Sequence, residues 1–329
     1  MARQRRGSNV YVLCKQTFVH TIMSDYRITK TIEEAAAEVR KTSFAIYQVP
    51  CKTGRSIRDA WREGVKVLNR SPPQNGSNHN HSVADTDQWT RIVKGSLYGY
   101  NEPSPAKRLF RAFPASSDQP WPSETFRQVS IEVAEQLQGI LLDCHEYLQE
   151  SVNRTSAQTP QTSNSAIKQE QRPTSPGVVI SRKRRRFEAS SSSLSTTSLP
   201  VRLDAKNCPL DYFLYHNQHP DTPNCTAHVD RGLLIAVCLT DVPGLEILSP
   251  HYLESENSTK SKWICPELAI HNSKLYSEAG DCSASNLICI MAGGQLAQSL
   301  GEDIPACVHR VRDKLKRSRL SISYELRIK

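Results

Sequence analysis

Two histidines and one aspartate in the C-terminal half have the types and spacing of metal ligands. His228 and Asp230 are two positions apart, so on a β-strand both side chains would project from the same face. His309 lies in a second predicted strand that could cross a barrel opposite the first. Two imidazoles and one carboxylate leave positions open for substrates and oxygen, as in non-haem Fe(II) oxygenases, whereas zinc more often recruits cysteine or a third histidine. The His-x-Asp pair alone also fits a polar loop, because so short a motif arises by chance.

An arginine and a serine on the last predicted strand would suit a carboxylate ligand. Arg319 and Ser321 follow His309 and lie on one face of that strand. A guanidinium binds a carboxylate through two parallel charge-assisted hydrogen bonds, and a hydroxyl can add a third. The pair could therefore hold a 2-oxo acid whose other end chelates iron. The alternative is an ordinary basic strand, because several lysines and arginines lie between Arg310 and Arg317 and charge runs are usually solvated.

The elements that must position these residues fall into two regions of different character. Residues 1–150 are predicted to form a helical region, with apolar residues at three- and four-residue steps and a capping box at Thr31. Residues 206–329 are predicted to be all-β, with short apolar runs separated by Pro, Gly, Asn and Ser. The predicted helices are Thr31–Lys41, Ser56–Asn69 and a third from just after Pro122 to about Glu150, and the strands are Ser43–Val49, Asp211–His216, Leu233–Thr240, Gly244–Leu248, Asn286–Ala292, Ala306–Val311 and Arg319–Leu326.

Between these regions, residues 151–205 are predicted to be a disordered insert. The stretch from Ser151 to Pro200 is rich in Ser, Thr, Gln and Pro and carries eight Lys or Arg against two Glu. Such a composition cannot bury enough apolar surface to offset its ordering entropy. The run Arg182–Arg186 has the density of a nuclear localisation signal or a nucleic-acid patch. The alternative is a solvated cluster of charged residues in a linker, which no other molecule recognises.

Composition excludes several classes of protein. The chain has 329 residues, a net charge of +9 and a mean hydropathy of -0.51, and no apolar run approaches the roughly 18 residues of a membrane span. No apolar stretch of signal-peptide length follows the basic N-terminus, so we expect a nuclear or cytoplasmic protein that is neither secreted nor bound to a membrane. Ten scattered cysteines indicate ordinary thiols in a reducing compartment.

Together these segments resemble the isopenicillin N synthase-like family of Fe(II)- and 2-oxoglutarate-dependent dioxygenases. The core segments of that family occur here in the same order, and Glu34–Pro50 and Gly99–Lys107 resemble its first helix and strand and a later loop. The similar core segments are His228-x-Asp230, Asp241-Val-Pro-Gly-Leu-Glu-Ile-Leu, Ile290-Met-Ala-Gly-Gly-Gln-Leu, His309-Arg-Val and Arg319-Leu-Ser.

The resemblance implies a β-dominated α+β fold with a double-stranded β-helix (jelly roll) core. It also implies that His228, Asp230 and His309 hold Fe(II), while Arg319 and Ser321 bind the C5 carboxylate of 2-oxoglutarate and Tyr215 adds a hydroxyl. Such an enzyme uses O2, with ascorbate as an auxiliary cofactor, and hydroxylates or demethylates its substrate with release of succinate and CO2.

The sequence departs from the family pattern at two places. Phe213 stands where the family often has an asparagine, two positions before Tyr215. The segment Ser249–Ser285 is longer than usual and is either a lid or a loop.

Three functions remain open from the sequence. The first is a dioxygenase acting on a small-molecule substrate. The second is a catalytically inactive nuclear scaffold whose basic insert contacts nucleic acid through Arg182–Arg186. The intact set of ligands argues against it, because a protein that had lost catalysis would be expected to have lost at least one of them. If the protein is nuclear, an import receptor is a further partner expected at Arg182–Arg186. The third is an iron oxidase of the same fold that does not use 2-oxoglutarate.

Overall fold

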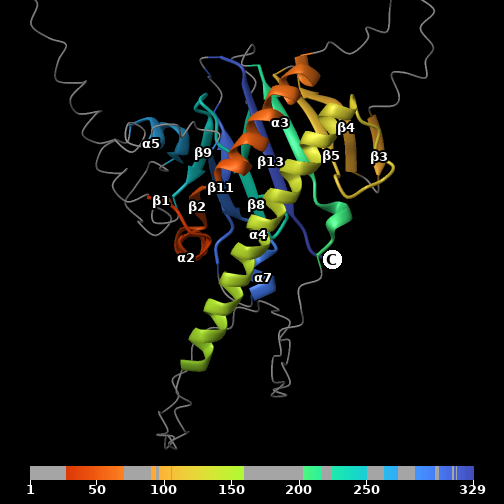
Figure 1. The fold of residues 1–329 in the computed structure, drawn as a ribbon. Helices are drawn as coiled ribbons and strands as arrows, with labels where there is room; N and C mark the ends of the chain where they lie inside the picture. The colour runs from red at the N-terminus through yellow and green to blue at the C-terminus, as the bar shows by residue number, and fades with distance from the viewer. Residues whose placement is uncertain are drawn as a thin grey trace, which may run out of the picture.

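Two facing β-sheets and a layer of helices make up the protein in the computed structural model (Figure 1). The structure describes residues 27–69, 90–93, 96–104, 106–158, 203–216, 224–249, 263–272, 286–300, 304–312, 315 and 317–329. The run Arg182–Arg186 lies outside them, as does most of the insert. No helix in these ranges is both long enough and apolar enough to cross a membrane.

The larger sheet has nine strands among the described residues and carries part of the candidate site. All neighbouring strands pair antiparallel except β1 and β2, which are parallel. Its order is β1 (Ile28–Thr29), β2 (Phe44–Gln48), β11 (Leu287–Ala292), β8 (Leu234–Cys238), β13 (Arg319–Leu326), β6 (Leu210–Tyr215), β5 (Lys107–Ala112), β4 (Ser96–Ser104) and β3 (Thr90–Val93).

The smaller sheet has four antiparallel strands among the described residues and carries two of the candidate ligands. Its order is β10 (Trp263–Ile264), β9 (Leu245–Leu248), β12 (His309–Val311) and β7 (Cys225–His228). The six C-terminal strands predicted from the sequence are all present, with boundaries shifted by at most three residues. The sheet-rich α+β class is therefore confirmed.

Three long helices cover one face of the larger sheet (Figure 1). Thr31 caps α2 through its hydroxyl, which accepts the Glu34 amide at 3.2 Å, and Ser43 ends the helix at a φ of 68°, a left-handed conformation that terminates helices. The helices are α2 (Ile32–Thr42), α3 (Cys51–Asn69) and α4 (Glu124–Gln158), with the shorter α5 (Pro266–Asn272), α7 (Leu296–Leu300) and a 3-10 turn at Ala205–Asn207.

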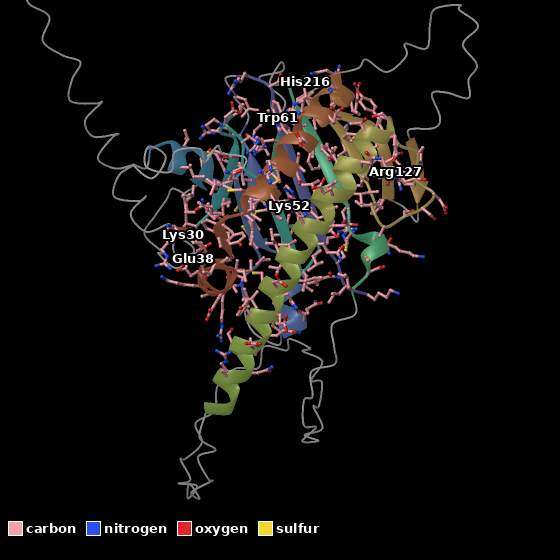
Figure 2. All side chains as sticks on the ribbon, viewed as in Figure 1. Lys30, Glu38, Lys52, Trp61, Arg127 and His216 are labelled. Carbon is pink, nitrogen blue, oxygen red and sulfur yellow. The ribbon has the colours of Figure 1, made fainter. Side chains whose placement is uncertain are left out.

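Strand alternation divides the core into two layers. On β13, Leu320, Ile322 and Tyr324 face the helices and join their cluster, while the alternate residues point to the smaller sheet. On β8, Ile235 and Val237 point to the smaller sheet and form a second apolar cluster with residues of β9 and β11. Outward residues such as Lys52 and Trp61 on α3 and Arg127 on α4 are exposed (Figure 2).

Besides β2, which corresponds to the predicted strand Ser43–Val49, the first 150 residues contain the strands β1, β3, β4 and β5. Gly99–Lys107, expected to be a loop, is mostly strand, because β4 runs to Ser104 and Lys107 begins β5. A register shift between Asn101 and Ser104 lets the β4–β5 hairpin accept the proline between them, since bulges tolerate residues that cannot join the ladder. Helix α4 also continues to Gln158, eight residues beyond the expected end.

A buried histidine on α4 that contacts Ser299 of α7 should make stability depend on pH. His145 is 5% exposed, and burial lowers its pKa to about 4 from an ordinary 6.5. Between these values only the unfolded chain binds the proton, so stability is complete above pH 6.5 and falls as the pH drops towards 4. We expect acidification from pH 7.5 to 5 to cost wild type about 2 kcal/mol more than His145→Gln, measured by urea unfolding. Equal losses in the two proteins would contradict this assignment.

Candidate metal centre and adjoining cavity

His228, Asp230 and His309 meet at one end of the smaller sheet. His228 ends β7 and pairs across the strands with His309, which begins β12. The Nε2 atom of His228 lies 3.6 Å from one carboxylate oxygen of Asp230, and the Nε2 atom of His309 lies 3.4 Å from the other. One ligand atom from each residue lies within 4.8 Å of the others. Asp230 itself lies beyond the end of β7, so the expectation of one continuous strand was wrong, yet the three side chains converge.

Backbone carbonyls orient both imidazoles towards the aspartate. The Nδ1 atom of His228 lies 2.8 Å from the Thr226 carbonyl oxygen, and that of His309 lies 3.2 Å from the Cys307 carbonyl oxygen. A neutral imidazole that donates its Nδ1–H to a carbonyl keeps the Nε2 lone pair for a metal. The chain therefore presents two imidazole nitrogens and a carboxylate to one point.

The side chains of His228 and Asp230 shift each other's pKa. The nearby Asp230 carboxylate, followed by the contact with Cys225, raises the pKa of His228 to about 10. Burial acts to raise the pKa of Asp230, but the contact with His228 and the charges of both histidines outweigh it and leave that pKa lowered. Burial lowers the pKa of His309. A metal would replace the proton of His228, because ligands bind in their deprotonated forms.

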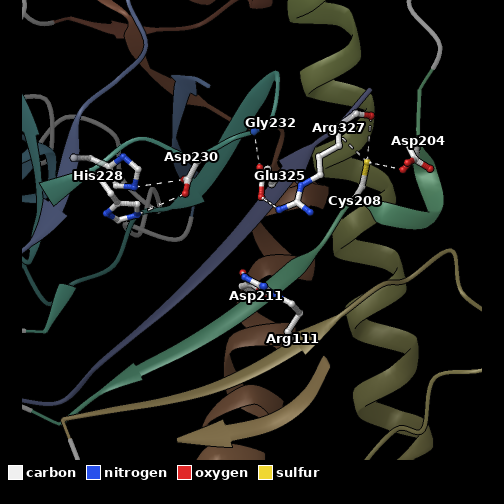
Figure 3. A network of polar contacts seen from close by, with 10 residues as sticks. Arg111, Asp204, Cys208, Asp211, His228, Asp230, Gly232, Glu325 and Arg327 are labelled. Carbon is white, nitrogen blue, oxygen red and sulfur yellow. Dashed lines mark hydrogen bonds and ion pairs between the residues drawn. The ribbon is translucent and has the colours of Figure 1, made fainter. Parts of the chain in front are cut away.

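Two close backbone approaches fix the turn that carries Asp230. Glu325 on β13 accepts the Gly232 amide (Figure 3), and the Gly294 amide donates to the Asp230 carbonyl oxygen at 2.8 Å. A Cβ atom on Gly293 would lie 2.0 Å from the Gly232 carbonyl oxygen, so only glycine fits there. This contact explains Gly293, the first glycine of the pair in the segment Ile290–Leu296.

A cavity of about 280 Å³ adjoins the three ligands, between the two sheets. The side chains of β5, β6 and β13 that point away from the helices form its floor. Cross-strand register arranges them in three rows, which are Lys107, Tyr215 and Arg319; then Leu109, Phe213 and Ser321; then Arg111, Asp211 and Ser323.

Arg319 is fully buried in this floor and keeps one donor atom free. Its Nη2 atom donates to Glu267 at 2.8 Å and its Nε atom donates to the Val242 carbonyl oxygen at 3.2 Å. Its Nη1 atom is buried and has no hydrogen-bond partner among the described residues. Gly244 makes room for the guanidinium, since a Cβ atom there would lie 2.7 Å from Arg319 Cδ.

Ser321 and Tyr215 flank Arg319 in the cavity lining. Tyr215 is its direct cross-strand partner, and burial raises the pKa of the phenol, which keeps it a neutral donor. The structure thus brings together Arg319 and Ser321, predicted to bind the C5 carboxylate, and Tyr215, predicted to contribute a hydroxyl to the cosubstrate.

Phe213, which departs from the family pattern, has a structural role in the cavity floor. Its ring stacks on Tyr215 with centroids 6.0 Å apart, and the Lys107 ammonium lies 4.3 Å from the Phe213 centroid. An aromatic ring here supports the tyrosine and attracts a cation.

An ion pair lines the far end of the cavity floor. Arg111 donates to both carboxylate oxygens of Asp211, at 2.7 and 2.6 Å (Figure 3). Both residues line the cavity, four positions along their strands from the Lys107 and Tyr215 row.

Four residues of the site were not predicted from the sequence. Glu267 lies in the long segment Ser249–Ser285, most of which is outside the described residues, and nothing in its local sequence marks it. Lys107 and Arg111 lie in a strand that the sequence did not predict. Glu325 alternates with apolar residues on the predicted last strand, as Arg319 and Ser321 do, and that alternation was the available signal.

Comparison with known proteins defines the class of fold. No protein-family model matches the sequence, and no curated protein matches it. A protein from Caulobacter crescentus assigned to the 2OG-Fe(II) oxygenase family matches with a TM-score of 0.56 at 15% identity, over 92% of this chain and 86% of that chain.

Two further solved structures carry 2-oxoglutarate. AtDAO1, a dioxygenase for auxin oxidation from Arabidopsis thaliana, matches with a TM-score of 0.54 at 14% identity, over 92% of this chain and 93% of that one. A full-length Neurospora crassa protein in complex with alpha-KG and 5-formyluracil matches with a TM-score of 0.55 at 12% identity, over 91% and 78%. The chain therefore has the fold of 2-oxoglutarate- and Fe(II)-dependent oxygenases.

Proposed function

We propose that the protein is a non-haem Fe(II)- and 2-oxoglutarate-dependent dioxygenase that hydroxylates or demethylates a small molecule and releases succinate and CO2. One observation carries this proposal. A two-histidine, one-carboxylate cluster and an arginine with a free buried donor line the same cavity. In this reading the facing sheets are the halves of a double-stranded β-helix of the isopenicillin N synthase-like kind.

The residues present fit both groups. His228, Asp230 and His309 would hold Fe(II), because two imidazoles and one carboxylate leave coordination positions open. The buried Arg319 Nη1 atom needs an acceptor, since an unpaired buried donor costs about 1–3 kcal/mol. A carboxylate of 2-oxoglutarate would accept from Nη1, with the Ser321 and Tyr215 hydroxyls beside it.

The chain's part in the reaction is binding, orientation and exclusion of water. Bound iron and 2-oxoglutarate supply the oxidising chemistry with O2. The Thr226 and Cys307 carbonyls hold the imidazoles in place, and the apolar cluster between the sheets closes one side of the cavity. Arg319 and Ser321 fix the distal carboxylate, which determines how the cosubstrate reaches the ligands.

The size of the cavity favours a small substrate. About 280 Å³ must accept cosubstrate and substrate groups together, which is near the lower limit of ligand pockets. The Neurospora crassa complex contains 5-formyluracil and AtDAO1 is a dioxygenase for auxin oxidation, and a substrate of that scale is what we propose here. A nuclear or cytoplasmic location, with import through Arg182–Arg186, remains part of the proposal.

An anaerobic titration with Fe(II) and 2-oxoglutarate tests the proposed function. We expect wild type to develop the metal-to-ligand charge-transfer band, and to convert 2-oxoglutarate to succinate once O2 and substrate are supplied. Metal binding and O2 consumption without the band would instead favour an oxidase that does not use 2-oxoglutarate. Absence of metal binding would overturn the proposal in favour of a scaffold, which salt-dependent nucleic-acid binding through Arg182–Arg186 would then support.

A further inference from the structure

The lysine and arginine side chains that line the cavity are Lys107, Arg111 and Arg319, and its carboxylates are Asp211, Asp230 and Glu325. Asp230 contacts the two histidine ligands, and Glu325 pairs with Arg327, which does not line the cavity, at 2.6 Å. Arg111 is neutralised by Asp211 at 2.6 Å, and Arg319 by Glu267 at 2.8 Å. Among the described residues, Lys107 is the cavity cation with no carboxylate partner, and its nearest recorded contacts are two aromatic rings.

The Arg319–Glu267 pair changes what the arginine can contribute. Both side chains have no exposure to solvent, so the carboxylate of Glu267 cancels the charge of the guanidinium at short range. Arg319 keeps its hydrogen-bonding Nη1 atom but adds little net positive charge. A dicarboxylate such as 2-oxoglutarate carries two negative charges. The metal centre can compensate the charge of the carboxylate near it, but not that of the distal carboxylate.

Lys107 is placed to supply the missing charge. It shares a floor row with Tyr215 and Arg319 across β5, β6 and β13. Its ammonium lies 4.3 Å from the centroid of Phe213 and 5.6 Å from that of Tyr215. The two aromatic rings therefore orient the ammonium without neutralising its charge.

We propose that Lys107 is a binding residue for the dianionic cosubstrate and makes the cavity select a dicarboxylate over a monocarboxylate 2-oxo acid. This inference rests on the proposed function. Arg319 and Ser321 then contribute hydrogen-bond geometry, while Lys107 contributes the net charge. Charge-assisted contacts are roughly twice as strong as neutral ones. Removal of the ammonium should therefore weaken the binding of the dianion more than that of a monocarboxylate.

The test measures binding and needs no turnover. Full-length protein loaded with Mn(II) is titrated calorimetrically with 2-oxoglutarate and with 2-oxopentanoate, which lacks the second carboxylate. For Lys107→Met we expect the Kd for 2-oxoglutarate to rise about tenfold, with a weaker dependence on salt. The Kd for 2-oxopentanoate should change less than threefold, and Lys107→Arg should restore most of the preference.

Lys52→Met is the matched control, because Lys52 is exposed on α3, on the opposite face of the sheet (Figure 2). It should bind both acids as wild type does. If wild type binds 2-oxoglutarate and Lys107→Met binds it equally well, the inference is wrong while the proposed function stands. If wild type binds neither acid, both are overturned.

Discussion

Replacement of Asp230 by alanine should abolish metal binding while leaving the fold intact. Asp230 contacts both histidines, at 3.6 and 3.4 Å, and supplies the one carboxylate of the cluster. Loss of a residue that only supports a ligand already costs 10–100-fold in metal affinity, so loss of the ligand itself should cost at least about 100-fold. Calorimetric titration of the metal-free protein with Mn(II) measures this directly.

Thermal stability gives a second readout of the same change. A metal that binds only the folded chain raises its stability with concentration, so saturating Mn(II) should raise the Tm of wild type and leave that of Asp230→Ala unchanged. Asp241→Ala is the control, because Asp241 pairs with Arg317 and its side chain is 57% exposed. Unchanged Mn(II) affinity in Asp230→Ala would show that the cluster is not the metal site.

Replacement of Arg319 by methionine should destabilise the protein as well as remove the carboxylate anchor. The variant leaves Glu267 fully buried without its partner, and breaking a buried ion pair from one side costs about 3–5 kcal/mol. Urea unfolding should show that loss. Weak 2-oxoglutarate binding by this variant alone would therefore not separate a binding role from a structural one.

The double variant Arg319→Met/Glu267→Leu separates the two roles. Replacing both partners with apolar side chains is often neutral, so most of the lost stability should return while 2-oxoglutarate binding stays absent. If the double variant regains binding together with stability, Arg319 is not the anchor. If Arg319→Met loses less than about 1 kcal/mol, the buried pair does not have the energetic role assigned to it.

Much of the fold could be predicted because strand alternation and helix periodicity are local signals. On Arg319–Leu326 the polar and apolar residues alternate without a break, and the structure places them on opposite faces of the larger sheet. The hairpin of β4 and β5 could not be predicted in this way, because its prolines and glycine resemble a loop and only pairing with β6 makes β5 a central strand.

The site was predictable where its chemistry lies in short motifs. His228, Asp230 and His309 could be proposed together because their residue types limit the possible partners. Glu267 could not, since its pairing with Arg319 joins residues 52 positions apart through a segment without a motif. Lys107 likewise could not be assigned to the site from the sequence, because only the strand register places it beside Tyr215.

The pairing of β5 with β6 determines how cooperatively the chain unfolds. These strands are joined residue by residue from Lys107 to Ala112, although α4 and residues 159–202 separate them in the sequence, and α4 packs in the same cluster as β8 and β13. The two chain halves therefore share one core and should melt in a single cooperative transition. Neither half alone would contain a complete cavity, so any ligand binding in the cavity should be lost together with the global fold.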